Sequence, residues 1–320
     1  MSRTNPRFPR KTSEDYQLGA VGGAAGSYEP AGGRELSAGG GRTDSARTRR
    51  RVSQVILYAL LIIGALIALM PMLWMLSASF MPTGEANTYP PHLIPSRITF
   101  DHYRELFTRL NLGRYLVNST LISVTVTAVS LVINSMAGYA FAKLRFRGRD
   151  RTFRILSLGL VLPVQVAMLP LFLLMKNLHL INTYWGVIIP GMASIFGIFL
   201  IRQYALSIPD DMLDAARIDG ASELRIYWSV VVPGILPILA TLAIWTFLAT
   251  WNDFMWPLIV LSDEAHYTLP VALANLSGEH VMDTELMMAG SVLTVIPVLA
   301  VFLFLQRYYI QGVMAGSVKG

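Results

Sequence analysis

The sequence predicts an all-α membrane protein with six transmembrane helices. Hydrophobic residues make up 53% of the 320 residues and charged residues 14%, whereas a soluble domain carries about 25% charged residues. Six apolar stretches approach the length of about 20 residues that crosses a bilayer. The chain has no cysteine, which excludes a disulfide framework, a thiolate metal site and a cysteine nucleophile.

The predicted spans follow one another after residue 51 and contain prolines. Pro71 lies in the first span, Pro163 and Pro170 lie in the third, and Pro297 lies in the sixth. Membrane bundles tolerate such residues because neighbouring helices satisfy the backbone groups that they leave free. The predicted boundaries are residues 55–80, 116–142, 153–175, 185–201, 235–261 and 287–305.

Residues 1–51 differ in composition from the rest of the chain. They are rich in Gly, Ser, Arg and Ala and lack apolar periodicity, so they cannot bury enough surface to offset the entropy of ordering. Their glycines do not resemble a phosphate-binding loop, because neither a preceding strand nor a following helix is predicted around them. We predict a disordered, basic, glycine-rich cytoplasmic tail over residues 1–51 and a membrane domain over residues 52–320.

The distribution of Lys and Arg predicts the orientation. With the N-terminus inside, only five of the 26 Lys and Arg residues fall in outer segments, and a basic run at residues 143–151 becomes an inner membrane anchor. Both termini are therefore expected in the bacterial cytoplasm, with the chain in the plasma membrane. All histidines fall in outer loops on this map, which excludes a histidine proton relay or metal site within the membrane: His92, His102, His179, His266 and His280.

The inner connection at residues 202–233 predicts two short helices joined at a glycine. Pro209 suits the first turn of a helix, where following acids also favour the backbone dipole. Gly220 suits a left-handed helix stop, and Ser222 suits the cap of a second helix that runs to residue 232, before Pro233. One face of the first helix carries an acidic rim around small residues, which suits an apolar cleft with basic edges on another protein: Asp211, Asp214, Ala215 and Ile218.

This connection resembles the EAA loop of binding-protein-dependent ABC permeases. That loop reads Glu-Ala-Ala-x-x-Asp-Gly-Ala and is followed by a proline, and here Asp214 keeps the charge of the leading Glu but is one methylene shorter. Gly220 alone could be a simple helix terminator, but within this motif we interpret it as the hinge of a docking loop. The resemblance implies that a separate ATPase docks on the following residues: Asp214, Ala215, Ala216, Asp219, Gly220, Ala221 and Pro233.

Other segments resemble the carbohydrate group of these permeases. Residues 90–107 resemble the first outer loop of sugar permeases, and residues 251–258 resemble the end of their fifth span. Residues 306–320 resemble the C-terminus of the maltose-type second permease, which reaches toward the ATPase. The resemblance covers about residues 55–320 and implies a type I ABC importer permease (MetI-like) bundle.

The resemblance also implies an assembly in which this chain performs no chemistry. The implied partners are a second permease subunit, a cytoplasmic ABC ATPase dimer, an extracellular or periplasmic sugar-binding protein and membrane lipid, but no nucleic acid. The sequence contains no Gly-x-x-x-x-Gly-Lys-Ser/Thr phosphate loop. We therefore expect this chain to be no enzyme and to bind no cofactor, with ATP and Mg held by the partner ATPase. The sequence leaves open which sugar or polyol phosphate is carried.

Two groups of polar residues are candidates for the substrate pathway. The second span carries small and polar residues on one face, including Asn134, and this face either lines the pathway or packs closely against another helix. Near the outer end of the fifth span, Trp251, Asn252 and Asp253 offer the aromatic ring, amide and carboxylate that bind sugars. A carboxylate within a span is a candidate functional residue, although tryptophans there also suit an interfacial belt.

Two other classes of protein remain as alternatives. An ion-driven secondary transporter would show inverted repeats and paired charges within the membrane, whereas this sequence shows no clear repeat and a single carboxylate near a span end. A membrane-embedded enzyme would need His, Asp or Ser clustered within the spans. The absence of histidine from the predicted spans argues against it.

Overall fold

A computed structural model describes most of the chain, namely residues 41–90, 92–279 and 283–317. Regular structure within these residues is entirely helical, as the sequence predicts. Most of the predicted tail, His280 and the last three residues lie outside the described part.

The chain divides into two units, Met1–Gly64 and Ala65–Gly320. The boundary falls inside helix α1 (Gly41–Ala78). This helix starts earlier than the sequence predicts. Residues 41–51, which were predicted to be part of the tail, already belong to it. Its apolar residues from Val52 to Met70 are exposed, as expected of a span that faces lipid or another chain.

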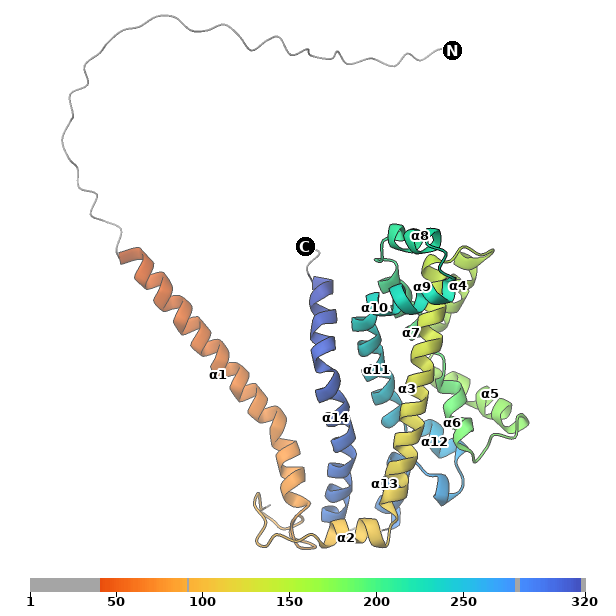
Figure 1. Ribbon diagram of the computed structural model, residues 1–320. Helices are drawn as coiled ribbons and strands as arrows, with labels where there is room; N and C mark the ends of the chain where they lie inside the picture. Colours follow the sequence, from red (N-terminus) through yellow and green to blue (C-terminus); the bar gives the residue numbers. More distant parts are fainter. Residues whose placement is uncertain (1–40, 91, 280–282, 318–320) are drawn as a thin grey trace, which may run out of the picture. The chain divides into compact units, whose positions relative to one another are not determined.

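The second unit contains the remaining helices, which Figure 1 labels along the chain. A short 3₁₀ turn at Gly159–Val161 and another at Glu264–His266 separate some of them. Their bounds are α2 (Asp101–Thr108), α3 (Leu112–Lys143), α4 (Arg149–Leu158), α5 (Val164–Asn177), α6 (Tyr184–Gly191), α7 (Ile195–Ala205), α8 (Asp210–Ile218), α9 (Glu223–Ile226), α10 (Val232–Gly234), α11 (Leu236–Trp251), α12 (Met255–Val260), α13 (Leu269–Glu279) and α14 (Thr284–Ser317).

Four helical segments of the described residues have the length and apolar character of membrane spans: Arg51–Ala78, Leu112–Lys143, Tyr184–Ala205 and Thr284–Gln306. The third of these includes a short break at residues 192–194, between α6 and α7. Two further helix pairs qualify only together, because each is bent at a break. Arg149–Val161 and Val164–Asn177 are bent by 106°, and Glu223–Gly234 and Leu236–Trp251 are bent by 81°. The six predicted spans are therefore present when each bent pair is counted as one broken span.

The third predicted span is not one continuous helix. Leu162 and Pro163 have extended backbone conformations, and α5 begins directly after them. Proline lacks an N–H group and disfavours the helical conformation of the residue before it. The chain consequently turns at Pro163, whereas Pro170 is accommodated inside α5.

The fifth predicted span also differs, because its last third is not part of α11. The helix ends at Trp251, and α12 starts at Met255. A side-chain oxygen of Asp253 accepts a hydrogen bond from the backbone N–H of Trp256 at 3.4 Å. Asp253 thus acts as a local cap for the next helix, which explains why an apolar stretch of this length breaks here.

Helix α3 is central to the second unit. It packs against α7 and α11, and α14 packs against α11 and α2. Figure 1 shows α4 and α8 at one end of α3 and α2 and α13 at the other. These two ends correspond to the inner and outer sides that the distribution of Lys and Arg predicts.

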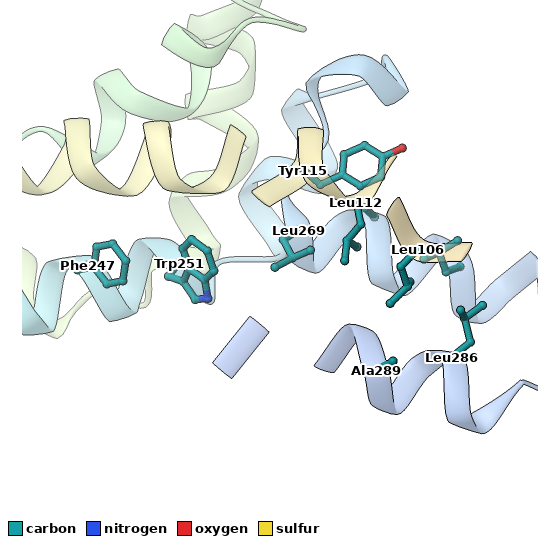
Figure 2. Packing of buried hydrophobic residues seen from close by; sticks show 10 residues of the cluster. Leu106, Leu112, Tyr115, Phe247, Trp251, Leu269, Leu286 and Ala289 are labelled. Carbon is teal, nitrogen blue, oxygen red and sulfur yellow. The ribbon is translucent and has the colours of Figure 1, made fainter. Parts of the chain in front are cut away.

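A buried apolar cluster joins the helices at the α2 end of this unit (Figure 2). Trp251 is its largest member and is 1% exposed. The cluster draws residues from five helices, which fixes α2 and α13 against the longer spans: Leu106, Leu112, Tyr115, Phe247, Trp251, Leu269, Ala272, Leu276, Leu286 and Ala289.

Candidate coupling site

The first helix of the connection at residues 202–233 forms as predicted. Helix α8 starts after Pro209, whose φ of −60° and ψ of 134° set the direction of entry. Asp210 and Asp211 occupy the first turn and Arg217 the last, so charges at both ends complement the helix dipole.

Gly220 terminates α8 in a left-handed conformation with a φ of +80°. Its backbone N–H donates to the carbonyl of Arg217 at 3.0 Å, and the N–H of Ala221 donates to the carbonyl of Ala216 at 3.0 Å. This pair of bonds is the Schellman motif, which satisfies the last carbonyls of a helix. The predicted glycine stop is confirmed.

The second helix is less regular than predicted. Ser222 caps it as expected, with its hydroxyl accepting from the N–H of Arg225 at 3.4 Å. The α-helical turn of α9 then passes into a π-helical turn at Tyr227–Val231 before α10. The N–H of Val232 donates to the carbonyl of Tyr227, five residues earlier, which is the hydrogen bond of a π-helix. The next residue, Pro233, has no N–H and therefore donates no helix hydrogen bond.

A single leucine anchors α8 to the membrane bundle. Leu213 is 1% exposed and belongs to a buried cluster with Ile201 of α7, Ile226 of α9 and Val231. Helix α8 is short and otherwise largely exposed, so this contact supplies most of its apolar packing. Leu213 therefore packs α8 directly against α7 and α9.

Lys143, the last residue of α3, ties the same connection by hydrogen bonds. Its ammonium group donates to the carbonyl of Ile208 at 2.6 Å and to the carboxylate of Asp210 at 2.7 Å. The Lys143 side chain is only 6% exposed. This hydrogen bond and charge hold the pKa of Asp210 below its ordinary value.

Arg217 links the two halves of the connection. Its guanidinium group donates to Asp214 at 2.7 Å and to Glu223 at 2.8 Å. The hydroxyl of Tyr139 on α3 donates to the other oxygen of Glu223 at 2.8 Å. The bonds to Glu223 and Asp214 raise the pKa of Arg217 above its ordinary value, so the guanidinium stays charged and the hinge is braced across Gly220.

The predicted docking residues lie together on this braced loop. The predicted face of α8 is exposed in the described chain, at Asp211, Asp214, Ala215 and Ile218. Ile218 is 85% exposed, so the face presents an apolar side chain beside its carboxylates. The other predicted docking residues are also exposed or half-buried, with Pro233 further along the chain in α10: Ala216, Asp219, Gly220, Ala221 and Pro233.

Sequence reasoning missed the residues that hold the loop. Lys143 belongs to the run interpreted as a membrane anchor, and Tyr139 and Glu223 were not candidates. Only their position at the end of a span and just past the glycine could have indicated a role, because the partners are distant in sequence.

The polar face of α3 is a packing face in the described chain. Asn134 is fully buried, accepts from the N–H of Ser194 at 3.0 Å and donates to the hydroxyl of Ser130 at 2.6 Å. One turn further on, Gly138 lies directly against Ile201 of α7. These contacts favour close packing over a pathway lining.

The three candidates near the end of α11 point in different directions. The Trp251 indole is buried and donates to the carbonyl of Thr294 on α14 at 3.1 Å. The exposed Asn252 donates to the carbonyl of Leu248 at 2.9 Å. Asp253 is half-buried and caps α12. Only Asn252 and Asp253 therefore remain accessible in the single chain.

A metal site has no support among the residues that the structure describes. They contain no group of three or more His, Cys, Asp or Glu side chains that could hold a metal ion.

Comparisons with known proteins place the chain among membrane components of importers. Residues 134–314 match the family model described as "Binding-protein-dependent transport system inner membrane component". The arabinooligosaccharides transport system permease protein AraQ of Halalkalibacterium halodurans is 41% identical over 85% of this chain and all of its own length. The lactose transport system permease protein LacG of Rhizobium radiobacter is 32% identical over 85% of this chain and 98% of its own.

A solved structure supports the fold. It is a bacterial ABC transporter involved in the import of the acidic polysaccharide alginate, and one of its chains matches with a TM-score of 0.72 and 28% identity. The match covers 81% of this chain and 97% of that chain. The predicted permease fold and the resemblance to carbohydrate permeases are confirmed, and so is the expectation of a transporter subunit rather than an enzyme, because these relatives are permeases. The chain is thus a multi-pass membrane protein that belongs to the binding-protein-dependent transport system inner membrane component family.

Proposed function

We propose that this chain forms half of the translocation pathway of an ATP-driven carbohydrate importer and docks a separate ATPase through residues 202–233. The sugar-importing relatives support the substrate class, and the family description supports a dependence on an external binding protein. A second permease completes the pathway, and the ATP and Mg belong to the ATPase. Both termini lie in the cytoplasm, as the distribution of Lys and Arg predicts.

One observation carries the docking proposal. Helix α8 exposes a continuous face while Leu213 on its opposite side packs against α7 and α9. The loop is also tied to α3, because Lys143 bonds the carbonyl of Ile208 and Tyr139 bonds Glu223. A loop that only connected two spans would not need this bracing. ATP-driven closure of the ATPase would displace α8, and the bracing would pass that displacement to α3, α7 and α9.

Co-purification in mild detergent tests the proposal. A tagged chain should bring down a second permease and an ATPase that contains a phosphate loop. Ala215→Trp places a bulky side chain on the docking face without removing an ion pair, and it should lose the ATPase but keep the second permease. Asp214→Lys should do the same by charge reversal.

The matched control is Asp150→Lys, a charge reversal on α4 at the same end of the bundle. Asp150 is exposed and pairs with a neighbouring arginine, as Asp214 does, but it lies outside the docking face. Retention of the ATPase by Ala215→Trp, or isolation of the wild-type chain without an ATPase, would overturn the proposal. The second outcome would favour an ion-driven transporter.

A further inference from the structure

A cavity of about 380 Å³ lies at the α2 end of the bundle, opposite the coupling loop. It lies between the segment after α2, the start of α3, the turn at Glu264–His266 and α13. Its size falls within the range of roughly 300–1,000 Å³ that is typical of small-molecule sites. None of the residues discussed for the coupling site lines it.

Two tyrosines and a carboxylate define the cavity wall. Tyr115 is 4% exposed, and its hydroxyl donates to Glu264 at 2.9 Å. Figure 2 shows the Tyr115 ring at the edge of the apolar cluster with its hydroxyl pointing away from the leucines. Tyr267 contributes a second, half-buried side chain, and Asn275 on α13 adds an exposed amide.

The wall is held in place by α3. The Asn118 amide donates to the carbonyls of Ala265 and Tyr267 at 3.1 and 2.9 Å. One residue further on, the hydroxyl of Ser119 accepts from the N–H of Leu269 at 2.7 Å. The turn and the start of α13 are therefore fixed before any ligand arrives, which lowers the entropic cost of binding.

These groups match the chemistry of a sugar. The C–H faces of a pyranose or furanose ring are apolar and pack on aromatic rings, while its hydroxyls donate to carboxylates and exchange hydrogen bonds with amides. Glu264 uses one oxygen for Tyr115 and is exposed. A carboxylate accepts several hydrogen bonds, so Glu264 can receive a sugar hydroxyl as well.

The charge at the cavity sets the type of sugar. The Arg109 guanidinium at the rim pairs with Glu105 at 2.5 Å, whereas Glu264 has no ionic partner among the described residues and accepts from the neutral Tyr115 hydroxyl. The Glu264 carboxylate is then the charge that a ligand meets, and it repels an anionic sugar. We propose that this cavity is a subsite for neutral oligosaccharides and discriminates against uronates; the proposal rests on the carbohydrate-import function proposed above.

Saturation-transfer NMR on the full chain in nanodiscs tests the subsite. The probes are arabinotriose, maltotriose and cellotriose as neutral trisaccharides and trigalacturonate as the acidic one, each at millimolar concentration. The wild-type chain should transfer saturation to at least one neutral probe and not to trigalacturonate. Absence of transfer to all three neutral probes, or equal transfer to trigalacturonate, overturns the proposal.

Three variants locate the signal. Tyr267→Ala should weaken it by about fivefold, the order expected from the loss of one aromatic packing contact, whereas Tyr267→Phe keeps the ring and should retain it. Tyr89→Ala is the control, since this tyrosine is 97% exposed and lies outside the cavity. Equal signals from Tyr267→Ala and Tyr89→Ala would overturn the assignment.

Glu264→Gln tests the charge without removing the acceptor that Tyr115 needs. It should keep the neutral signal within about twofold and admit trigalacturonate, because the repulsion is removed but the hydrogen bond is kept. Continued exclusion of trigalacturonate would refute the role of the charge. Co-purification of the ATPase tests the proposed function independently, so a preparation that binds the ATPase but no neutral sugar refutes the subsite alone.

Discussion

Replacement of Gly220 tests the coupling loop most directly, because its cost can be worked out from the backbone. Gly220 has a φ of +80°, and no neighbouring atom lies within 4 Å of the point that a Cβ would occupy, so Gly220→Ala meets strain but no clash. An L-residue in the left-handed region costs about 1–2 kcal/mol. This cost corresponds to a roughly 5- to 30-fold increase in local opening of the α8–α9 hinge.

The order of the variants follows from the same geometry. Gly220→Asn should cost less than Gly220→Ala, because asparagine tolerates the left-handed conformation. Gly220→Pro should cost most, because proline cannot adopt a positive φ and also loses the N–H that bonds the carbonyl of Arg217. Hydrogen exchange of the Ala221 amide, with detection by mass spectrometry, reports the opening. The affinity for the partner ATPase should fall in the same order.

Gly148 provides a matched control. It has a φ of +86° at the start of α4, with only Thr152 near a Cβ position. Gly148→Ala therefore carries the same strain as Gly220→Ala but lies outside the docking loop, and it should leave ATPase affinity unchanged. If Gly220→Ala exchanges as slowly as wild type, or both alanine variants lose the ATPase equally, the hinge reasoning is refuted.

Two further predictions concern α3. Gly138→Ala brings a Cβ within 2.6 Å of Ile201 and should destabilise the bundle by about 1–3 kcal/mol, seen as a lower Tm in fluorescence-monitored unfolding. Gly64→Ala, in open space inside α1, should not lower the Tm, because alanine favours a helix more than glycine does. An unchanged Tm for Gly138→Ala would contradict the close packing. Lys143→Met should speed hydrogen exchange in α8. Lys143 lowers the pKa of Asp210 from 3.8, so the stabilisation of α8 by this ion pair persists from neutral pH to below about pH 4. It is lost as the pH falls through the lowered pKa of Asp210. A loss of protection in α8 already at about pH 6 would contradict this.

The fold was predictable where a single local physical requirement decides the structure. Apolar length alone located the spans, because a bilayer imposes the same requirement on every helix. The stop at Gly220 was predictable because glycine, which has no Cβ, adopts a positive φ at the least cost. Both signals are local in sequence, so neither depends on knowing the tertiary contacts.

The bracing of the coupling loop was not predictable for the opposite reason. Lys143 and Asp210 are 67 residues apart, and Tyr139 and Glu223 are 84 apart. A lysine at the end of a span is expected as a membrane anchor in any topology. Only the packing of α3 against α7 brings its ammonium group to the carbonyl of Ile208, and this packing is a tertiary property.

Asp253 shows how a polar residue in an apolar stretch has two physical outcomes. A carboxylate inside a span is costly, and this cost made Asp253 a candidate for substrate contact. The cost is also reduced when the helix ends and the carboxylate caps the next one, as Asp253 does for α12 through the N–H of Trp256. Capping engages one oxygen and leaves Asp253 half-buried, so the two roles are compatible. An apolar run interrupted by a carboxylate therefore predicts a helix break first, and a binding role only where the side chain stays accessible.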